Sequence, residues 1–276
     1  MCILFIALNQ HPLFPLIIAA NRDEYFSRPS KNMHYWADKP DILAGRDLLK
    51  GGSWLGVNRA GGFCAVTNFR TAQPMNPKAV SRGALIDHYL SASKASSRNH
   101  HENFISHLNR DYAQYNPFNL VFGNAQALWA FSSQTGSHIP LKNGFHSISN
   151  GELDQPWPKM SQGVNQLTSL ISDKASGVSF KTLNQIMTNQ TQAHDDQLPN
   201  TGIELEKEKM LSSIFIRGEQ YGTRTTSVLL YSLNQIDIQE TNYDTSGKVT
   251  DQQNFKLSKI DQKRNSPSAI TTQQQT

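Results

Sequence analysis

The chain has 276 residues, of which 37% are hydrophobic and 17% are charged. This composition excludes a disordered chain and allows a sizeable buried core. The net charge is only +4 and the basic residues are scattered, so no nucleic-acid partner is expected.

The first third of the chain is rich in predicted strands. Residues 2–8 and 16–20 are nearly continuous apolar runs, typical of strands that are covered on both faces. Residues 54–57 and 63–68 flank the turn at 58–62, whose two glycines can adopt positive φ angles. We therefore expect two hairpins in this region.

The middle of the chain is mainly helical in pattern. Ser81 is a candidate cap for a helix, and four apolar stripes have helical spacing: Leu85/Ile86/Tyr89/Leu90, Phe104/Ile105/Leu108, Val164/Leu167/Leu170/Ile171 and Phe180/Leu183/Ile186/Met187. A further hairpin is predicted between the second and third stripes, with strands at 119–122 and 128–131 around Gly123.

The last third returns to strands. Residues 190–210 are polar and contain Pro199 and Gly202, which predicts a loop or a mobile insert. Strands are predicted at 213–216, 225–231, 236–243 and 254–257. The polar residues 258–276 predict a disordered tail, which leaves one domain at 1–257.

Strands that come in hairpins and helices that come in pairs predict an α+β fold. The expected architecture is an αββα four-layer sandwich, with two stacked, mainly antiparallel sheets flanked by helices. The alternating strand–helix order of a parallel sheet is absent.

The cysteine content and the N-terminus indicate the compartment. Cys2 and Cys64 are too few for a disulfide framework, which indicates a reducing environment. No positive charge precedes the first apolar run, and no apolar stretch reaches about 18 residues. We expect a cytoplasmic protein with no transmembrane segment.

Cys2 is the first candidate for chemistry. If Met1 is removed, Cys2 carries a thiol and a free α-amino group, so one residue supplies both a nucleophile and a base. The competing interpretation is a small buried residue at the start of a strand. A hairpin would bring Arg22 and Asp23 back to Cys2, at the mouth of a crevice between two sheets. Asp23 could hold the amine, and Arg22 could bind a carboxylate.

Other polar residues follow predicted strands or turns. Asn68 and Asn150 each end a strand and could donate to an oxyanion, although Asn is also common in turns. Arg224 lies between a glycine turn and a strand, where its side chain could point into a cleft. The glycine-rich segment 45–56 could cradle an anion or could make tight turns around Trp54.

The nine histidines do not have the spacing of a metal site, and no metal site is predicted. His34, His88, His146 or Cys2 could ligate a haem iron. Each of these residues is also common at the surface or in a core.

These residues occur within a larger set of motifs. The set comprises Met1-Cys2, Ala-Ala-Asn-Arg-Asp-Glu at 19–24, Arg28-Pro29, Trp36, Ala-Gly-Arg-Asp at 44–47, Gly-Gly-Ser-Trp-Leu-Gly at 51–56, Thr67-Asn68 with Arg70, Ser-Arg-Gly at 81–83, Asn119-Leu120, Ser-Asn-Gly at 149–151, Leu153-Asp154, Trp-Pro-Lys at 157–159 and Tyr-Gly-Thr-Arg-Thr-Thr at 221–226. With these motifs the chain resembles the NRDE family, also called the transport and Golgi organization protein 2 family, over most of residues 1–257.

The NRDE family in turn resembles the cysteine-type N-terminal-nucleophile hydrolases, which include penicillin V acylase and bile-salt hydrolase. That resemblance implies an αββα sandwich and a site of Cys2, Arg22, Asp23, Asn68, Asn150 and Arg224. The chain departs from the pattern because Arg22 and Asp23 are adjacent rather than spaced.

The NRDE resemblance implies haem trafficking, or the handling of lipids or acyl-CoA. Haem and acyl-CoA are amphipathic anions, and Arg22, Arg46, Arg70 and Arg224 would bind such a ligand. Haem donor and acceptor proteins would then be partners. The alternative is an amidohydrolase that needs no cofactor, in which Cys2 attacks an N-acyl amide. A scaffolding role is a third possibility, supported only by the polar tail.

Overall fold

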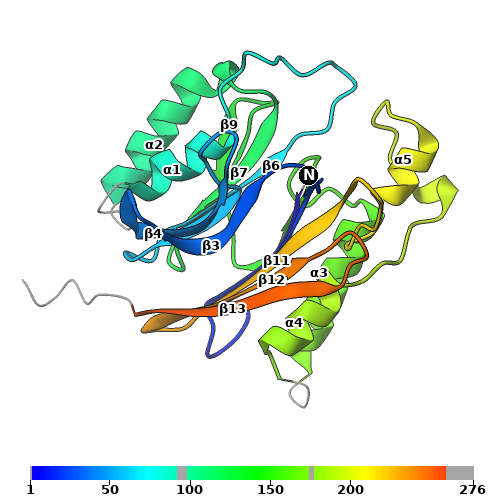
Figure 1. The fold of residues 1–276 in the computed structure, drawn as a ribbon. Helices are drawn as coiled ribbons and strands as arrows, with labels where there is room; N and C mark the ends of the chain where they lie inside the picture. The colour runs from blue at the N-terminus through cyan, green and yellow to red at the C-terminus, as the bar shows by residue number, and fades with distance from the viewer. Residues whose placement is uncertain (1, 92–97, 174–176, 259–276) are drawn as a thin grey trace, which may run out of the picture.

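The computed structural model describes residues 2–91, 98–173 and 177–258. Two antiparallel sheets pack face to face between two pairs of helices, which is the predicted αββα sandwich (Figure 1). The six-stranded sheet has the order β10(Gly144–Ile148), β1(Cys2–Leu8), β2(Leu16–Tyr25), β11(Tyr221–Tyr231), β12(Gln235–Tyr243) and β13(Val249–Ser258). The seven-stranded sheet has the order β3(Ser30–Trp36), β4(Lys39–Asp47), β5(Leu55–Asn58), β6(Phe63–Asn68), β7(Phe118–Gly123), β8(Leu128–Ser132) and β9(Ser137–Pro140).

The alternation of side chains along β1 explains why the six-stranded sheet is covered on both faces. Leu4, Ile6 and Leu8 join the core between the two sheets. Ile3 and Phe5 join a separate core under the helices. Because every residue of β1 is buried, the strand reads as one continuous apolar run rather than as an alternating pattern.

Each sheet carries its own helical layer, as Figure 1 shows. The helices α1(Gly83–Ser91) and α2(Arg98–Asp111) cover the seven-stranded sheet, and the short helix η1(Tyr112–Gln114) follows them. The helices α3(Pro158–Ser172) and α4(Phe180–Met187) cover the six-stranded sheet. The apolar stripes of the sequence therefore face the sheets, as expected for amphipathic helices.

The prediction of a strand at 213–216 is wrong. This segment is irregular because its backbone groups bond to side chains and loops. The Asn21 amide donates to the Ile214 carbonyl over 2.9 Å, and the Phe215 N–H donates to the Asn189 carbonyl over 2.8 Å. Ile214, Phe215 and Ile216 are buried without forming a ladder, and Ile214 belongs to the core under α3 and α4.

The sequence patterns did not predict several elements of the fold. The strands β3, β4 and β9 were not predicted, whereas β10 is the strand that was expected to end at Asn150. The pattern of β3 alternates poorly because register shifts interrupt its pairing with β4. The predicted loop at 190–210 contains η2(Asp195–Gln197) and α5(Leu205–Met210). The predicted tail lies outside the described residues from 259 onward. None of the helices described here combines the length and the apolar character that crossing a membrane requires.

A buried carboxylate ties the two sheets together at one edge. Glu240 on β12 is 1% exposed, and its Oε1 accepts a 2.7 Å hydrogen bond from the Met33 N–H of β3. Asn242 donates to the same oxygen over 3.2 Å. Burial raises the pKa of Glu240, and the two hydrogen bonds oppose that rise.

We expect Glu240→Ala to lower the free energy of unfolding by roughly 1–3 kcal/mol, because the buried Met33 N–H loses its acceptor. Glu240→Gln keeps an oxygen acceptor, so its free energy of unfolding should fall by less. Urea unfolding measures both variants, with the exposed Glu219→Ala as the control. Equal losses in the Ala and Gln variants would contradict the proposed role of the hydrogen bond.

Candidate functional site

A row of polar side chains crosses one end of the six-stranded sheet. Cys2 of β1 stands opposite Arg22 of β2, and Arg22 stands opposite Thr225 of β11. Thr225 in turn stands opposite Asn242 of β12 and donates to its side-chain oxygen over 2.9 Å. Cys2 belongs to the core between the sheets, so this row faces the seven-stranded sheet.

The row borders a cavity of about 420 Å³ between the two sheets. Six cationic and four acidic residues line it: Arg22, Arg28, Lys31, Arg46, Lys50 and Arg82, and Asp23, Glu24, Asp47 and Glu240. An apolar part of the wall comes from Trp54, Val66, Met75, Pro77 and Val80. The cavity therefore combines excess positive charge with apolar surface.

The thiol of Cys2 is shielded. Cys2 is 6% exposed, and burial raises its pKa to about 11, against the lowering effect of Arg22. The backbone at Cys2 is also fixed, because the Ser149 hydroxyl donates to the Cys2 carbonyl over 2.9 Å. With Met1 in place the sulfur is therefore a protonated thiol at neutral pH.

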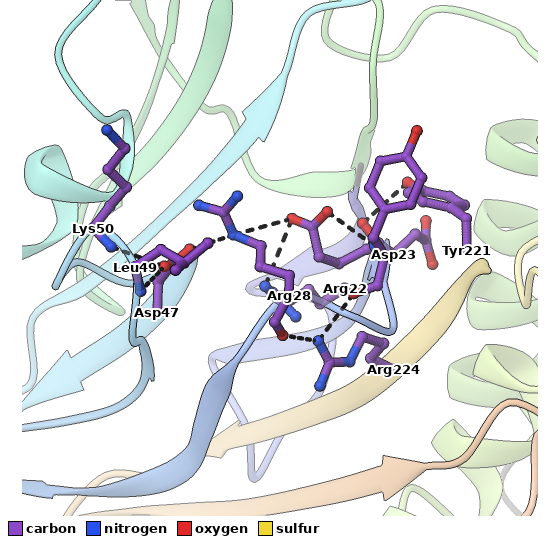
Figure 2. Close-up of polar contacts among 10 residues, drawn as sticks. Arg22, Asp23, Arg28, Asp47, Leu49, Lys50, Tyr221 and Arg224 are labelled. Carbon is purple, nitrogen blue, oxygen red and sulfur yellow. Dashed lines mark hydrogen bonds and ion pairs between the residues drawn. The ribbon is translucent and has the colours of Figure 1, made fainter. Parts of the chain in front are cut away.

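Arg22 and Asp23 point in opposite directions, because successive side chains of a strand alternate between faces (Figure 2). Asp23 is 1% exposed, and its Oδ1 accepts a 2.7 Å hydrogen bond from Thr223. Burial raises the pKa of Asp23, and the charge of Lys159 opposes the rise. Asp23 thus lies at the end of the cavity but is fastened on the side of α3.

A chain of ion pairs crosses from one sheet to the other at the cavity mouth, as Figure 2 shows. Arg22 lies 3.6 Å from the Glu24 carboxylate, and Arg28 lies 3.8 Å from it. Arg28 also bonds Asp47 at the end of β4 over 2.6 Å. The Asp47 carboxylate in turn accepts hydrogen bonds from the backbone N–H groups of Leu49 and Lys50. The chain links β2 to the loop after β4.

Arg224 does not line the cavity. A register shift between Thr223 and Thr225 makes Arg224 the extra residue of a β-bulge. Its guanidinium donates to the carbonyl of Tyr25 over 3.1 Å and to the carbonyl of Arg28 (Figure 2). Arg224 therefore holds the loop after β2 in place.

The two candidate oxyanion donors differ in position. Asn68 lines the cavity, whereas Asn150 is fully buried beside it and does not line it. Asn150 donates its side-chain NH₂ to the Asn68 carbonyl over 2.8 Å. Among the described residues, the side chain of Asn68 makes no hydrogen bond. Asn68 is thus the one of the two whose amide faces open space.

Two of the arginines expected to bind a ligand are already paired. Arg46 lines the cavity, but it bonds both oxygens of Asp38 and lies 4.2 Å above the ring of Trp36. Arg70 is outside the cavity lining and forms a buried ion pair with Glu208 of α5. These pairings leave less capacity for an anionic ligand.

Sequence reasoning missed two cations near Cys2, although both lie in motifs noted above. Arg82, of Ser81-Arg82-Gly83, lines the cavity and donates to the Pro117 carbonyl over 3.0 Å. Lys159, of Trp157-Pro158-Lys159, is 2% exposed, and burial lowers its pKa to about 8. Within the described ranges, no group of three or more His, Cys, Asp or Glu side chains could hold a metal ion.

The family model described as Transport and Golgi organisation 2 matches residues 1–245. The human Transport and Golgi organization protein 2 homolog is 30% identical over 253 residues, which cover 83% of this chain and 88% of that protein. The Mus musculus homolog is 29% identical, covering 85% of this chain and 90% of that protein. The Drosophila melanogaster protein is 30% identical, covering 83% and 87% respectively.

Solved structures with a similar fold include a mutant conjugated bile acid hydrolase from Clostridium perfringens. It is 10% identical with a TM-score of 0.47, and the match covers 94% of this chain and 98% of that one. An N-acylethanolamine-hydrolyzing acid amidase ortholog from Caenorhabditis elegans is also 10% identical with a TM-score of 0.47, covering 83% and 92%. Likenesses at this level say nothing about the chemistry of this chain.

We expect Glu208→Ala to lower the free energy of unfolding by about 3–5 kcal/mol, because Arg70 would stay buried without its carboxylate. The double variant Arg70→Met/Glu208→Leu removes both charges and should recover most of the loss. Urea unfolding checks both variants. A double variant no more stable than the single one would show that the ion pair is not the cause.

Proposed function

Because the chain belongs to the Transport and Golgi organisation 2 family, we propose that it binds and carries an amphipathic anion in the cytoplasm. The ligand class is haem or a molecule such as acyl-CoA, and donor and acceptor proteins for that ligand would be its partners. The names of the relatives include the word transport, which is consistent with a carrier function. The ligand is cargo here, and no resident cofactor is required.

One observation carries this proposal, namely the composition of the cavity wall. An excess of cationic over acidic side chains stands beside Trp54, Met75, Pro77 and Val80. A volume of about 420 Å³ lies within the range of small-molecule sites, about 300–1,000 Å³. Cationic side chains would hold the anionic groups of the ligand, and the apolar wall would cover its body.

The fit to haem can be stated for particular residues. Of the four candidate iron ligands in the sequence, Cys2 lines the cavity, whereas His34, His88 and His146 do not. Arg22 would hold a propionate, and Trp54 would cover the ring. The shielded, protonated thiol of Cys2 is the group that would have to lose a proton to bind iron.

Titration with haem and with a long-chain acyl-CoA tests the carrier proposal. We expect saturable binding to the wild type, followed by absorbance for haem and by tryptophan fluorescence for acyl-CoA. Arg22→Gln should weaken binding about tenfold or more, because a charge-assisted hydrogen bond is lost. Arg59→Gln, outside the cavity lining, is the matched control. A linear, unsaturable response with both ligands would reject the proposal.

A second candidate function is amide hydrolysis, favoured by Cys2 and Asn68 lining the same cavity. After removal of Met1, the Cys2 sulfur would attack the amide carbonyl carbon and form a thioester. The α-amino group would take the thiol proton and pass it to the leaving amine, and water would then hydrolyse the thioester. Asp23 would orient the α-amino group, and Asn68 would donate to the oxyanion.

Intact-mass measurement and substrate turnover test the hydrolase. A hydrolase requires the loss of Met1 and turnover of an N-acyl amide that Cys2→Ala abolishes. The carrier proposal predicts instead that wild type and Cys2→Ala both lack turnover, while Cys2→Ala still binds acyl-CoA. Retained Met1 removes the proposed base and would exclude the hydrolytic mechanism.

A further inference from the structure

The start of helix α1 forms part of the cavity wall next to Cys2 and Arg22. Ser81, Arg82 and Gly83 all line the cavity, and α1 extends from Gly83 over nine residues. Ala84 and Leu85 donate their N–H groups to the carbonyls of Ser81 and Arg82. In the part of the chain described, the N–H groups of Arg82 and Gly83 donate no hydrogen bond. Two backbone donors without an acceptor among the described residues therefore stand at the positive end of a helix, on residues that line the cavity.

Two glycines bring this helix start into place. A Cβ on Gly52 would lie 2.4 Å from the Gly83 carbonyl carbon, and a Cβ on Gly83 would lie 2.8 Å from the Ser53 carbonyl oxygen. The Ser53 N–H donates to the Gly83 carbonyl over 3.3 Å. The glycine-rich segment after β4 thus packs against the α1 start at backbone contact distance, which no larger residue would allow.

Arg22 provides a second, independent sign of an anion site. Its side chain is 9% exposed and lines the cavity. The 3.6 Å contact with Glu24 is beyond hydrogen-bond distance, and among the described residues the guanidinium makes no hydrogen bond. The guanidinium therefore keeps its hydrogen-bonding capacity beside the Glu24 charge, and the geometry suits an added acceptor.

Arg82 reaches the same region as Arg22. Burial is the main cause that lowers the pKa of Arg82, and the charges of Glu24 and Arg28 also act on its guanidinium. Glu24 thus lies near both arginines and is the acidic group that an incoming anion must compete with. Its side chain is 24% exposed, and its Oε1 also accepts the Tyr25 N–H over 2.9 Å.

We propose that the start of α1, with the Arg82 side chain and the backbone N–H groups of Arg82 and Gly83, joins Arg22 to form an oxyanion-binding site in the cavity that these residues line. The site takes the carboxylate or phosphate group of an amphipathic ligand. The body of the ligand then extends along Met75, Pro77 and Val80, on the loop that leads into α1. This inference rests on the proposed binding function and names the residues that hold the anionic group.

The test compares three probes with one apolar chain, namely decanoate, decyl phosphate and decanol, titrated against the full chain. Tryptophan fluorescence reports binding, because Trp54 lines the cavity. We expect the wild type to bind the two anions at least about tenfold more tightly than decanol. The ratio between decanoate and decyl phosphate identifies which oxyanion the site prefers.

Two variants sharpen the test, because one removes a positive charge from the site and the other removes a negative charge. Arg82→Gln should lower the affinity for both anions about tenfold or more and leave the affinity for decanol unchanged. Arg82→Lys keeps the charge and should lower the anion affinities less. Glu24→Gln should raise the affinity for both anions several-fold, because it removes the competing carboxylate. Arg110→Gln removes an exposed arginine of α2 and should change nothing. Circular dichroism checks that each variant is folded.

The outcomes separate this inference from the proposed function. If no probe binds the wild type, the binding function and the oxyanion site both fail. If the probes bind but Arg82→Gln and Glu24→Gln leave the anion affinities unchanged, only the oxyanion site is rejected. Equal losses for decanol and the anions in Arg82→Gln would also reject it, because they indicate lost packing rather than lost charge recognition.

Discussion

The pairing of β1 with β2 places Cys2 opposite Arg22, and the rest of the site depends on this register. Because side chains alternate along a strand, the same register sends Arg22 toward the cavity and Asp23 toward α3. The two adjacent residues therefore serve two faces of the sheet. A slip of one residue would exchange the faces of Arg22 and Asp23 and turn Arg22 toward the helices.

Polar contacts between distant segments hold the two sheets together around the cavity. Glu240 fastens an edge strand of one sheet to the other, and the ion pairs of Glu24, Arg28 and Asp47 bridge the mouth. The cavity lies beside these contacts, whereas apolar side chains pack the core between the sheets. The same carboxylates offset part of the positive charge of the wall.

The distribution of charge around the cavity supports the proposed binding function. Cationic donors with spare hydrogen-bonding capacity, Arg22 and Arg82, face the cavity beside an apolar wall. By contrast, the thiol of Cys2 has a raised pKa, and the Asn150 side-chain NH₂ already donates to the Asn68 carbonyl. A nucleophile needs a lowered pKa or a base, and here the base would exist only after Met1 is removed.

The sequence by itself determined the sandwich, the helical layers and the nearness of Cys2 to Arg22, because apolar periodicity and a short hairpin are local properties. It could not decide which charges share the cavity. A bulge turns Arg224 outward, Glu208 neutralises Arg70 from 138 residues away, and the Gly52–Gly83 contact brings Arg82 inward. Register shifts, long-range ion pairs and backbone contacts arise only when distant segments meet, so the tertiary structure decided them.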